Sequence, residues 1–437
     1  MKKFILFFLF PFVSDAQIIT TIAGCSDTGG YSGDSALAIA AKLNAPSDVK
    51  FDKDGNLFIA DAANHVIRKI DTSGIISTFA GIGTPGYEGD GGLAINAKLN
   101  TPYSLAFDDT GNVLITDYGG YDIRKVNTAG IITTIAGGFY PGSGGDGGLA
   151  IHAQLKHPAG IVIDRSGNIY FADANNYDIR KINTAGIITT IAGVGVYGYT
   201  GDGGLAVNAK LGATGMIAFD RSGSLLITDW KQHVVRRIDM STNIITTIAG
   251  TGVNGYSGDG GLAIYAALES PTGIAIDDNN NIYISDQGAN VVRKINVSTG
   301  VITTFAGNDS AGYSGDGGLA IKAKLNNENN VTFDKSGNAY VADTYNNRIR
   351  KITADTTKII VNKTLYPGIS PNPARTSVTI TTKVNFETLT ITDALGQTVF
   401  SKVYTSTKST TIDISSYAVG MYFVKLNGVW SEKFVKE

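Results

Sequence analysis

The chain has 437 residues, enough for one large repeat domain and a small second domain. Its 36 Lys and Arg residues nearly cancel its 38 Asp and Glu residues, so the net charge of -2 excludes a basic surface for nucleic acid. The 54 glycines predict many short strands joined by turns, and the single cysteine excludes an internal disulfide.

The first 16 residues have the pattern of a secretory signal peptide. Two lysines at residues 2–3 precede an apolar segment at residues 4–13, which is too short to span a bilayer. Ser14 and Ala16 supply small side chains at the two positions that a signal peptidase reads, so we expect the mature chain to begin at Gln17. No later segment of the sequence is long and apolar enough to predict a transmembrane helix.

One motif is repeated six times at a spacing of 56 or 57 residues, as from Asp61 to Asp117 and from Asp229 to Asp286. Repetition at a fixed period predicts stacked units that share one core. Each copy has one aspartate after its second predicted strand and another in a Gly-Asp-Gly-Gly step, which reads Gly-Asp-Ser in the first copy. The strand-end aspartates are Asp61, Asp117, Asp173, Asp229, Asp286 and Asp343, and those of the glycine-rich step are Asp34, Asp90, Asp146, Asp202, Asp259 and Asp316.

Each copy predicts four short antiparallel strands. In the second copy these are residues 104–108, 113–116, 123–127 and 131–136, separated by Gly-containing turns or a polar loop. Such strands form one twisted sheet, and about 21 further residues lead to the next copy. Six sheets arranged radially predict an all-β fold, a six-bladed β-propeller.

The ends of the repeat predict how the ring closes. The fourth-strand motif also occurs at residues 18–24, before any first strand, whereas the sixth copy loses the pattern after Ile352. We therefore expect residues 18–23 to pair with residues 349–352. This pairing completes the sixth blade and removes two open sheet edges.

Three segments, at residues 61–70, 271–277 and 343–350, resemble the NHL repeat, and the resemblance extends over roughly residues 18–352. It implies a six-bladed propeller, which we place at residues 17–358. Proteins of this family include protein- or RNA-binding platforms, sensor domains, and a few lyases or hydrolases with a metal in the central channel. The resemblance thus implies the fold and leaves the function open.

After a linker at residues 359–365, the composition changes to one rich in Thr, Ser and Val. Residues 366–437 predict a small β-sandwich. The Pro-Asn-Pro opening at residues 371–373, the Gly-Met-Tyr strand at residues 420–422 and the terminal Lys-Phe-Val-Lys resemble the type A sorting domain of type IX secretion in Bacteroidota. This resemblance implies export through the type IX machinery to the medium or the outer cell surface. An ordinary adhesive β-sandwich is the alternative.

Features present in every copy favour a structural role. The strand-end aspartates can accept hydrogen bonds from loop amides and pair with the arginine that each copy carries. The Gly-Asp-Gly-Gly loops offer Ca²⁺ only one carboxylate each, so we favour a turn whose aspartate caps a short helix, residues 93–99 in the second copy. None of the four histidines lies in a zinc-binding pattern. We therefore assign no catalytic residue, no metal ligand and no cofactor.

A ligand site is expected where the copies differ. The loops between second and third strands and the loops between blades share one face of a propeller, here called the loop face. Exposed aromatic side chains beside polar groups suit sugar rings or peptide side chains, although loop tips also vary freely. The ligand-binding candidates are Tyr103, Tyr118, Tyr121, Tyr177, Trp230 and Tyr345, with Asp48 and Asn330 at the mouth of the channel.

Together these observations predict a secreted or cell-surface binding module without catalysis, whose ligand is a protein or a glycan. The alternative is an extracellular lyase or hydrolase with a metal-assisted site in the channel. Asp48, Glu328 and Asn330 form the one asymmetric set of acidic and amide groups that could serve such a site.

Overall fold

The computed structural model describes residues 17–138, 140–354, 368–393, 397–426 and 429–437. The chain divides into two compact units, Met1–Ala354 and Asp355–Glu437. The predicted signal peptide, residues 1–16, and the predicted linker, residues 359–365, lie outside the described residues. No helix in the described part of the chain has the length and apolar character needed to cross a membrane.

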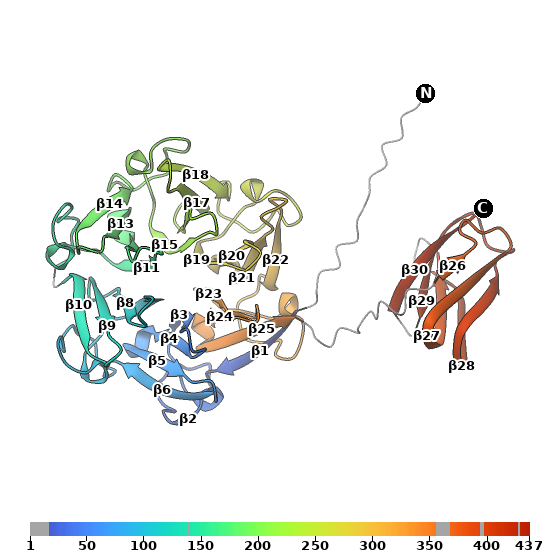
Figure 1. Ribbon diagram of the computed structural model, residues 1–437, viewed down its shortest axis with the longest axis horizontal. Helices are drawn as coiled ribbons and strands as arrows, with labels where there is room; N and C mark the ends of the chain where they lie inside the picture. Colours follow the sequence, from blue (N-terminus) through green and yellow to red (C-terminus); the bar gives the residue numbers. More distant parts are fainter. Residues whose placement is uncertain (1–16, 139, 355–367, 394–396, 427–428) are drawn as a thin grey trace. The chain divides into compact units, whose positions relative to one another are not determined.

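The first unit consists of six sheets arranged around a central axis (Figure 1). The first strands of neighbouring blades contact one another around the whole ring, and the first strand of blade six contacts that of blade one. This confirms the predicted six-bladed propeller. Blade one contains β3 (Pro46–Phe51), β4 (Leu57–Asp61), β5 (Val66–Ile70) and β6 (Ile75–Ala80), with β2 (Ala36–Leu37) paired to β6; blade two contains β7 (Pro102–Phe107), β8 (Val113–Asp117), β9 (Asp122–Val126) and β10 (Ile132–Gly137).

The remaining blades repeat this order. Blade three contains β11 (Pro158–Ile163), β12 (Ile169–Asp173), β13 (Asp178–Ile182) and β14 (Ile188–Ala192). Blade four contains β15 (Thr214–Phe219), β16 (Leu225–Asp229), β17 (Val234–Asp239) and β18 (Ile244–Ala249). Blade five contains β19 (Pro271–Ile276), β20 (Ile282–Asp286), β21 (Val291–Ile295) and β22 (Ile302–Gly307), and blade six contains β23 (Val331–Phe333), β24 (Ala339–Asp343), β25 (Arg348–Ala354) and β1 (Gln17–Ala23).

The core lies between consecutive blades. Phe58 and Ile67 of blade one pack with Leu105 and Ile115 of blade two in one buried cluster. Every residue of β4 is buried because neighbouring blades cover both faces of each sheet. The second strands therefore have continuous apolar runs rather than the alternation of a half-exposed strand.

The first strand of the chain closes the ring, as predicted. β1 pairs antiparallel with β25, and Ile19 lies opposite Ile352. The backbone of Ile19 also exchanges hydrogen bonds with the loop before blade six, at 3.1 Å to the Gly318 carbonyl and 2.8 Å from the Gly317 amide. The fourth strand of blade two contacts its own loop through the same kind of bond, from Ile132 to Gly92. β1 therefore takes the full place of a fourth strand.

The second unit is a single, nearly closed antiparallel sheet. Its strands are β26 (Gly368–Ser370), β27 (Ser377–Thr392), β28 (Thr398–Asp413), β29 (Gly420–Leu426) and β30 (Val429–Lys436). β27 pairs with β26 in its first half and with β29 in its second half, so the sheet folds over a buried cluster. The two layers expected of a small sandwich are thus parts of one continuous sheet.

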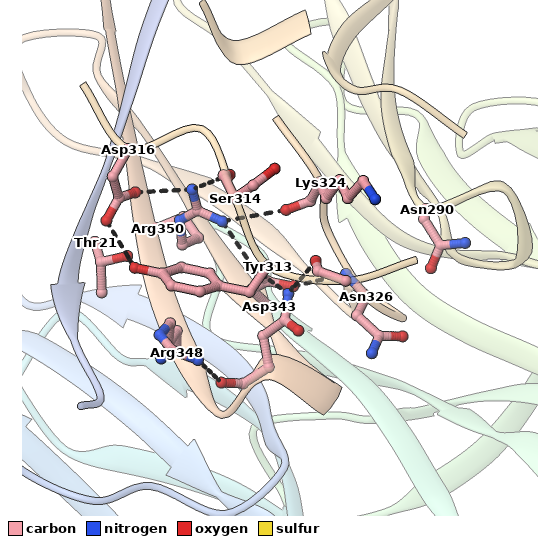
Figure 2. Close-up of polar contacts among 12 residues, drawn as sticks. Thr21, Asn290, Tyr313, Ser314, Asp316, Lys324, Asn326, Asp343, Arg348 and Arg350 are labelled. Carbon is pink, nitrogen blue, oxygen red and sulfur yellow. Dashed lines mark hydrogen bonds and ion pairs between the residues drawn. The ribbon is translucent and has the colours of Figure 1, made fainter. Parts of the chain in front are cut away.

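An arginine in the third strand of each blade is buried under the loop that enters the blade. In blade six, Arg350 donates hydrogen bonds to Asp316 at 2.8 Å, to the Ser314 carbonyl at 3.1 Å and to Asp343 at 3.1 Å (Figure 2). The ring of Tyr313 lies 5.0 Å from its guanidinium carbon. The corresponding arginines, all at most 1 % exposed, are Arg68, Arg124, Arg180, Arg236 and Arg293.

The glycine-rich aspartates therefore bind arginine and do not cap a helix. Asp90 accepts a hydrogen bond from Arg124 at 2.6 Å and one from the Thr134 amide at 2.9 Å. The helix expected at residues 93–99 is only a 3₁₀ turn, Ala94–Asn96, and no side chain caps it. The prediction of a helix cap was wrong because a buried guanidinium is a stronger partner for the carboxylate than a few loop amides.

The strand-end aspartates connect the loop before each blade to its second strand. Asp61 accepts the Asn44 amide at 2.7 Å, and Asp343 accepts the Asn326 amide at 2.8 Å. Burial raises the pKa of Asp61 to about 7, although its hydrogen bonds and Arg68 lower it. The same contact is made by Asp117 with Asn100, Asp173 with Lys156, Asp229 with Gly212 and Asp286 with Glu269.

One position beside the buried arginine differs among the blades. The residue two places before the arginine is valine in blades one, four and five, aspartate in blades two and three, and arginine in blade six. Burial, together with Asp173 and Asp146, raises the pKa of Asp178 to about 8. Blades two and three thus each carry an extra buried carboxyl. The residues at this position are Val66, Asp122, Asp178, Val234, Val291 and Arg348.

The closing strand gives the first testable expectation. Ile19→Asp should lower the free energy of unfolding by about 3 kcal/mol or more, because it places an unpaired carboxylate in a fully buried position. Thr20→Asp, one residue away on the exposed side of β1, should change it by less than about 0.5 kcal/mol. Thermal and urea unfolding measure both. Equal, small effects would show that β1 does not hold the ring closed.

The extra buried carboxyl of blade three, Asp178, predicts that the stability of the protein depends on pH. An aspartate in the unfolded chain titrates near pH 4 and Asp178 in the fold near pH 8, so the native state binds more protons in between and stability falls as pH rises. Asp178→Val should therefore be more stable than the parent by more than about 1 kcal/mol at pH 8, with a smaller difference at pH 5. Melting temperatures across this range test it; a pH-independent difference would contradict it.

Candidate functional site

The loop face is built by contacts between two kinds of loop. In blades one, two, three, five and six, the loop after the second strand donates a backbone hydrogen bond to the end of the loop that enters the same blade, as from the Gly119 amide to the Asn100 carbonyl at 2.8 Å. The same contact joins Ala63 to Asn44 in blade one, at 3.1 Å. The strand-end aspartates support these loops from below, so the structural repeat positions the variable residues.

Four aromatic rings form a continuous row on this face, here called the aromatic row: Tyr103, Tyr118, His157 and Tyr121. Tyr103 comes from β7, Tyr118 and Tyr121 from the loop after β8, and His157 from the end of the loop that enters blade three. The ring centres of Tyr103 and Tyr118 are 5.3 Å apart, those of Tyr118 and His157 are 4.5 Å apart, and those of His157 and Tyr121 are 5.0 Å apart. Three predicted candidates are thus brought together.

His157 was not predicted as part of this site. Its backbone is left-handed, with φ of 59°, and its Nδ1 lies 2.8 Å from the Asn175 side-chain nitrogen. Burial and the charge of Lys156 lower the pKa of His157, so the imidazole is neutral at pH 7. Only its place just before Pro158, where the other copies have small or polar residues, distinguishes it in the sequence.

Tyr103 is held at the inner end of the row by a contact across the channel. Its hydroxyl donates a hydrogen bond of 3.0 Å to Asn329, which belongs to blade six, 226 residues away in the chain. Its backbone carbonyl accepts a hydrogen bond of 2.8 Å from Ser47 of blade one. The inner tyrosine is therefore fixed by two other blades before any ligand is bound.

The predicted channel residues Asp48 and Asn330 meet in a buried network. Asn330 donates to Asp48 at 2.7 Å, while the other carboxylate oxygen of Asp48 accepts from the Ser104 hydroxyl at 2.8 Å and the Leu105 amide at 2.9 Å. Lys50 lies 3.7 Å from the first oxygen. Asp48 is fully buried and Asn330 is 1 % exposed, so both tie blades six, one and two together at the neck of the channel.

Glu328 does not join this network. It is fully buried, its two carboxylate oxygens have no hydrogen-bond partner, and burial raises its pKa well above the usual range. Among the residues that the structure describes, no three His, Cys, Asp or Glu side chains are grouped so that they could hold a metal ion. The set of Asp48, Glu328 and Asn330 proposed from the sequence is thus not assembled at one point.

The other aromatic candidates make separate contacts. Tyr177 packs edge-to-face on Tyr197, with centres 5.5 Å apart. Trp230 of blade four is covered by the ammonium of Lys231 at 4.2 Å, and Tyr345 of blade six is 61 % exposed. The structure therefore concentrates the aromatic candidates on blades two and three rather than around the whole ring.

The opposite face, which carries the turns between first and second strands, is hollowed. A cavity of about 620 Å³ at this end of the channel is lined by Val162, Ala218, Ala275 and Lys50. Here the first strands present small side chains, whereas at the neck they approach so closely that a Cβ on Gly160 would lie 2.5 Å from the Met216 backbone. Sequence reasoning missed this cavity because small apolar residues in repeats predict packing rather than a hollow.

Comparisons with known proteins agree with this architecture. Residues 368–437 match the model of the secretion system C-terminal sorting domain, and residues 19–88, 138–200 and 252–314 match that of the teneurin NHL domain. Human teneurin-4 is 28% identical over 357 residues, which are 72% of this chain and 12% of that protein. The Arabidopsis thaliana protein SUPPRESSOR OF QUENCHING 1, chloroplastic, is 25% identical over 272 residues, which are 60% of this chain and 26% of that one. The chain thus spans about a quarter or less of the length of these relatives.

Solved structures show the same fold. A Bacteroides thetaiotaomicron protein of unknown function superposes with a TM-score of 0.58 at 18% identity, covering 77% of this chain and 76% of that one. An auxiliary nutrient binding protein from the same species gives a TM-score of 0.55 at 17% identity, with the same coverage. The chain therefore consists of a β-propeller, three segments of which match an NHL domain, and a C-terminal secretion-system sorting domain, which indicates a secreted or cell-surface protein.

Proposed function

We propose that the propeller is a non-catalytic binding module that holds a carbohydrate or peptide ligand on its loop face. The observation that carries this proposal is the aromatic row, which runs from Tyr103 at the channel to Tyr121. Flat rings offer a large contact area at low entropic cost, and half-buried rings that already pack on one another lose little freedom when a ligand binds.

Polar groups beside the aromatic row can orient a ligand that packs on the rings. Asn329 holds the inner tyrosine and Asn175 holds the histidine, so amide groups lie at two points along the row. A ligand with alternating apolar faces and hydroxyl or amide edges fits this arrangement, which is the chemistry of sugar rings and of peptides. The fold is also that of a Bacteroides auxiliary nutrient binding protein, which supports ligand binding as a use of this scaffold.

The hydrogen bonds of Asp48 at the neck of the channel favour a binding function over a catalytic one. A general base needs a free lone pair within reach of its substrate. Asp48 accepts hydrogen bonds from Asn330, Ser104 and two backbone amides, so its lone pairs are used inside the protein. The extracellular lyase or hydrolase considered as the alternative would have to displace this network.

The binding site is tested with a glycan and peptide array. Tyr118→Ala should weaken binding of the captured ligand by about 1–3 kcal/mol, because Tyr118 packs between the rings of Tyr103 and His157. Tyr265→Ala, which removes a tyrosine that is 74 % exposed and outside the row, is the matched control and should leave affinity unchanged. Equal affinity of the two variants would reject the aromatic row as the site.

Substitutions at two neighbouring residues, Asp229 and Trp230, distinguish an effect on binding from an effect on stability. Asp229→Ala should lower the free energy of unfolding by about 1–3 kcal/mol, because the Gly212 amide loses its acceptor, while the folded fraction keeps its affinity. Trp230→Ala should leave the melting temperature nearly unchanged. If Asp229→Ala abolished binding or turnover without lowering stability, the repeated aspartates would be functional and the enzyme alternative would be preferred.

We also propose that the second unit is an export signal that the type IX secretion machinery recognises. Removing residues 355–437 should trap a folded propeller inside the cell envelope, since the first unit is compact by itself. Fractionation and surface proteolysis in a bacterium with type IX secretion measure this, with the full chain as control. Equal amounts of truncated and full-length protein outside the cell would contradict the proposal.

A further inference from the structure

A second cavity lies over the outer strands of blade two. Its volume is about 690 Å³, and β9, β10 and the loops that enter and leave blade two line it. It shares no lining residue with the aromatic row, so binding in this cavity is independent of the function proposed for the loop face. We call it the rim pocket, and its lining includes Glu88, Asp90, Asp122, Tyr140, His152 and Gln154.

Asp122, in the wall of this pocket, has a carboxylate oxygen without a hydrogen-bond partner. It is 2 % exposed, and its Oδ1 has no hydrogen-bond partner. Blades one, four and five have valine at this position, so the repeat does not need the carboxyl for folding. A buried carboxyl group without a partner lowers the stability of the fold. Its presence therefore indicates that a bound ligand supplies the missing partner.

The neighbouring basic side chains form ion pairs with other carboxylates. Asp90 takes the hydrogen bond of Arg124 at 2.6 Å, and Glu88 pairs with Lys98 at 3.1 Å. Burial raises the pKa of Asp122, Arg124 lowers it and Asp90 raises it, so that the pKa of Asp122 lies at about 7. A bound cation would favour the ionised form.

Two substitutions make this pocket more acidic than its counterparts. Glu88 stands where the other five copies have serine, glycine or threonine. Gln154, on the opposite wall, replaces the lysine that four copies carry, Lys98 among them. The cavity over blade two thus combines an additional carboxylate on the loop that enters blade two with the loss of a lysine on the loop that enters blade three.

The remaining walls suit an aliphatic stem with a charged end. Tyr140 is 74 % exposed, and Ile151 is 41 % exposed, so both present apolar surface at the pocket. Long basic side chains pack their methylene groups on such surfaces and direct the charged group to carboxylates, and a cation also binds the face of a tyrosine.

We propose that the rim pocket binds the arginine or lysine side chain of a peptide or protein partner. The stem lies against Tyr140 and Ile151, and the cationic group approaches Asp122 and Glu88. The site is separate from the loop face, so one propeller can hold a ligand and a basic partner chain at the same time.

The experiment titrates the full mature protein with Nα-acetyl-L-arginine amide and follows binding by calorimetry. We expect saturable binding, with the uncharged isostere Nα-acetyl-L-citrulline amide at least about tenfold weaker because it lacks the charge. Asp122→Val should weaken arginine amide binding at least about tenfold. Since valine is native to three blades, this variant should fold, and its melting temperature should equal or exceed that of the parent.

Asp178→Val is the matched control, because it removes the same carboxyl from blade three, where Gly144 replaces Glu88. It should leave arginine amide binding unchanged. Absence of saturable binding, equal affinity for the citrulline amide, or equal loss in the two valine variants would overturn the proposal. Free L-arginine distinguishes a peptide partner from a free amino acid as the ligand. If free L-arginine bound about tenfold more tightly than the arginine amide, the ligand would be an amino acid and the assignment to a peptide partner would be overturned.

Discussion

Six buried guanidinium groups hold the propeller loops in place. Each arginine joins the third strand of its blade to the glycine-rich aspartate and to carbonyls of the loop that enters the blade, as Arg350 does with Asp316 and Ser314 (Figure 2). Removing one partner of a buried ion pair leaves an uncompensated charge and costs about 3–5 kcal/mol. This ion pair holds each loop together with buried apolar residues of the loop itself, such as Ala97 and Leu99, which pack in the core between blades one and two. Because the same pair recurs in all six blades, the loop face has a fixed frame on which individual residues can vary.

The candidate binding sites lie where the six blades differ in sequence. Blade two differs from the others in several ways: it supplies Tyr103, Tyr118 and Tyr121 to the aromatic row, and it gains Asp122 and Glu88 at the rim pocket. Blade six differs in another way, since Arg348 lies 3.6 Å from the Tyr313 ring, on which Arg350 also packs. A fold made of equal units has a central axis that any ligand would meet in six equivalent ways. Unequal blades are what allow such a ring to bind one ligand in one orientation.

The two faces of the channel differ for a simple reason. The first strands present residues two apart to the channel, so Asp48 points to the neck and Lys50 to the wider end of the same strand. At the neck, glycines such as Gly160 and Gly273 let neighbouring strands approach closely, and Asp48 joins Asn330 and Ser104 in a buried network. At the other end, small apolar residues leave a cavity. The loop face thus presents side chains above this network, while the opposite face contains a cavity.

The sequence alone determined the blade, the number of blades, the closing role of residues 18–23 and the nature of the tail, because these depend on periodicity and on local strand and turn patterns. It also predicted that the strand-end aspartates accept hydrogen bonds from loop amides, as Asp61 does from Asn44. It did not determine the partner of Asp90, which is Arg124 and not a helix, nor the place of His157 in the aromatic row. Tyr103 and Asn329 are 226 residues apart and meet only because the ring closes. Contacts across a ring depend on the curvature of the whole assembly, which no local pattern encodes, so only the tertiary structure decided which of the variable residues act together.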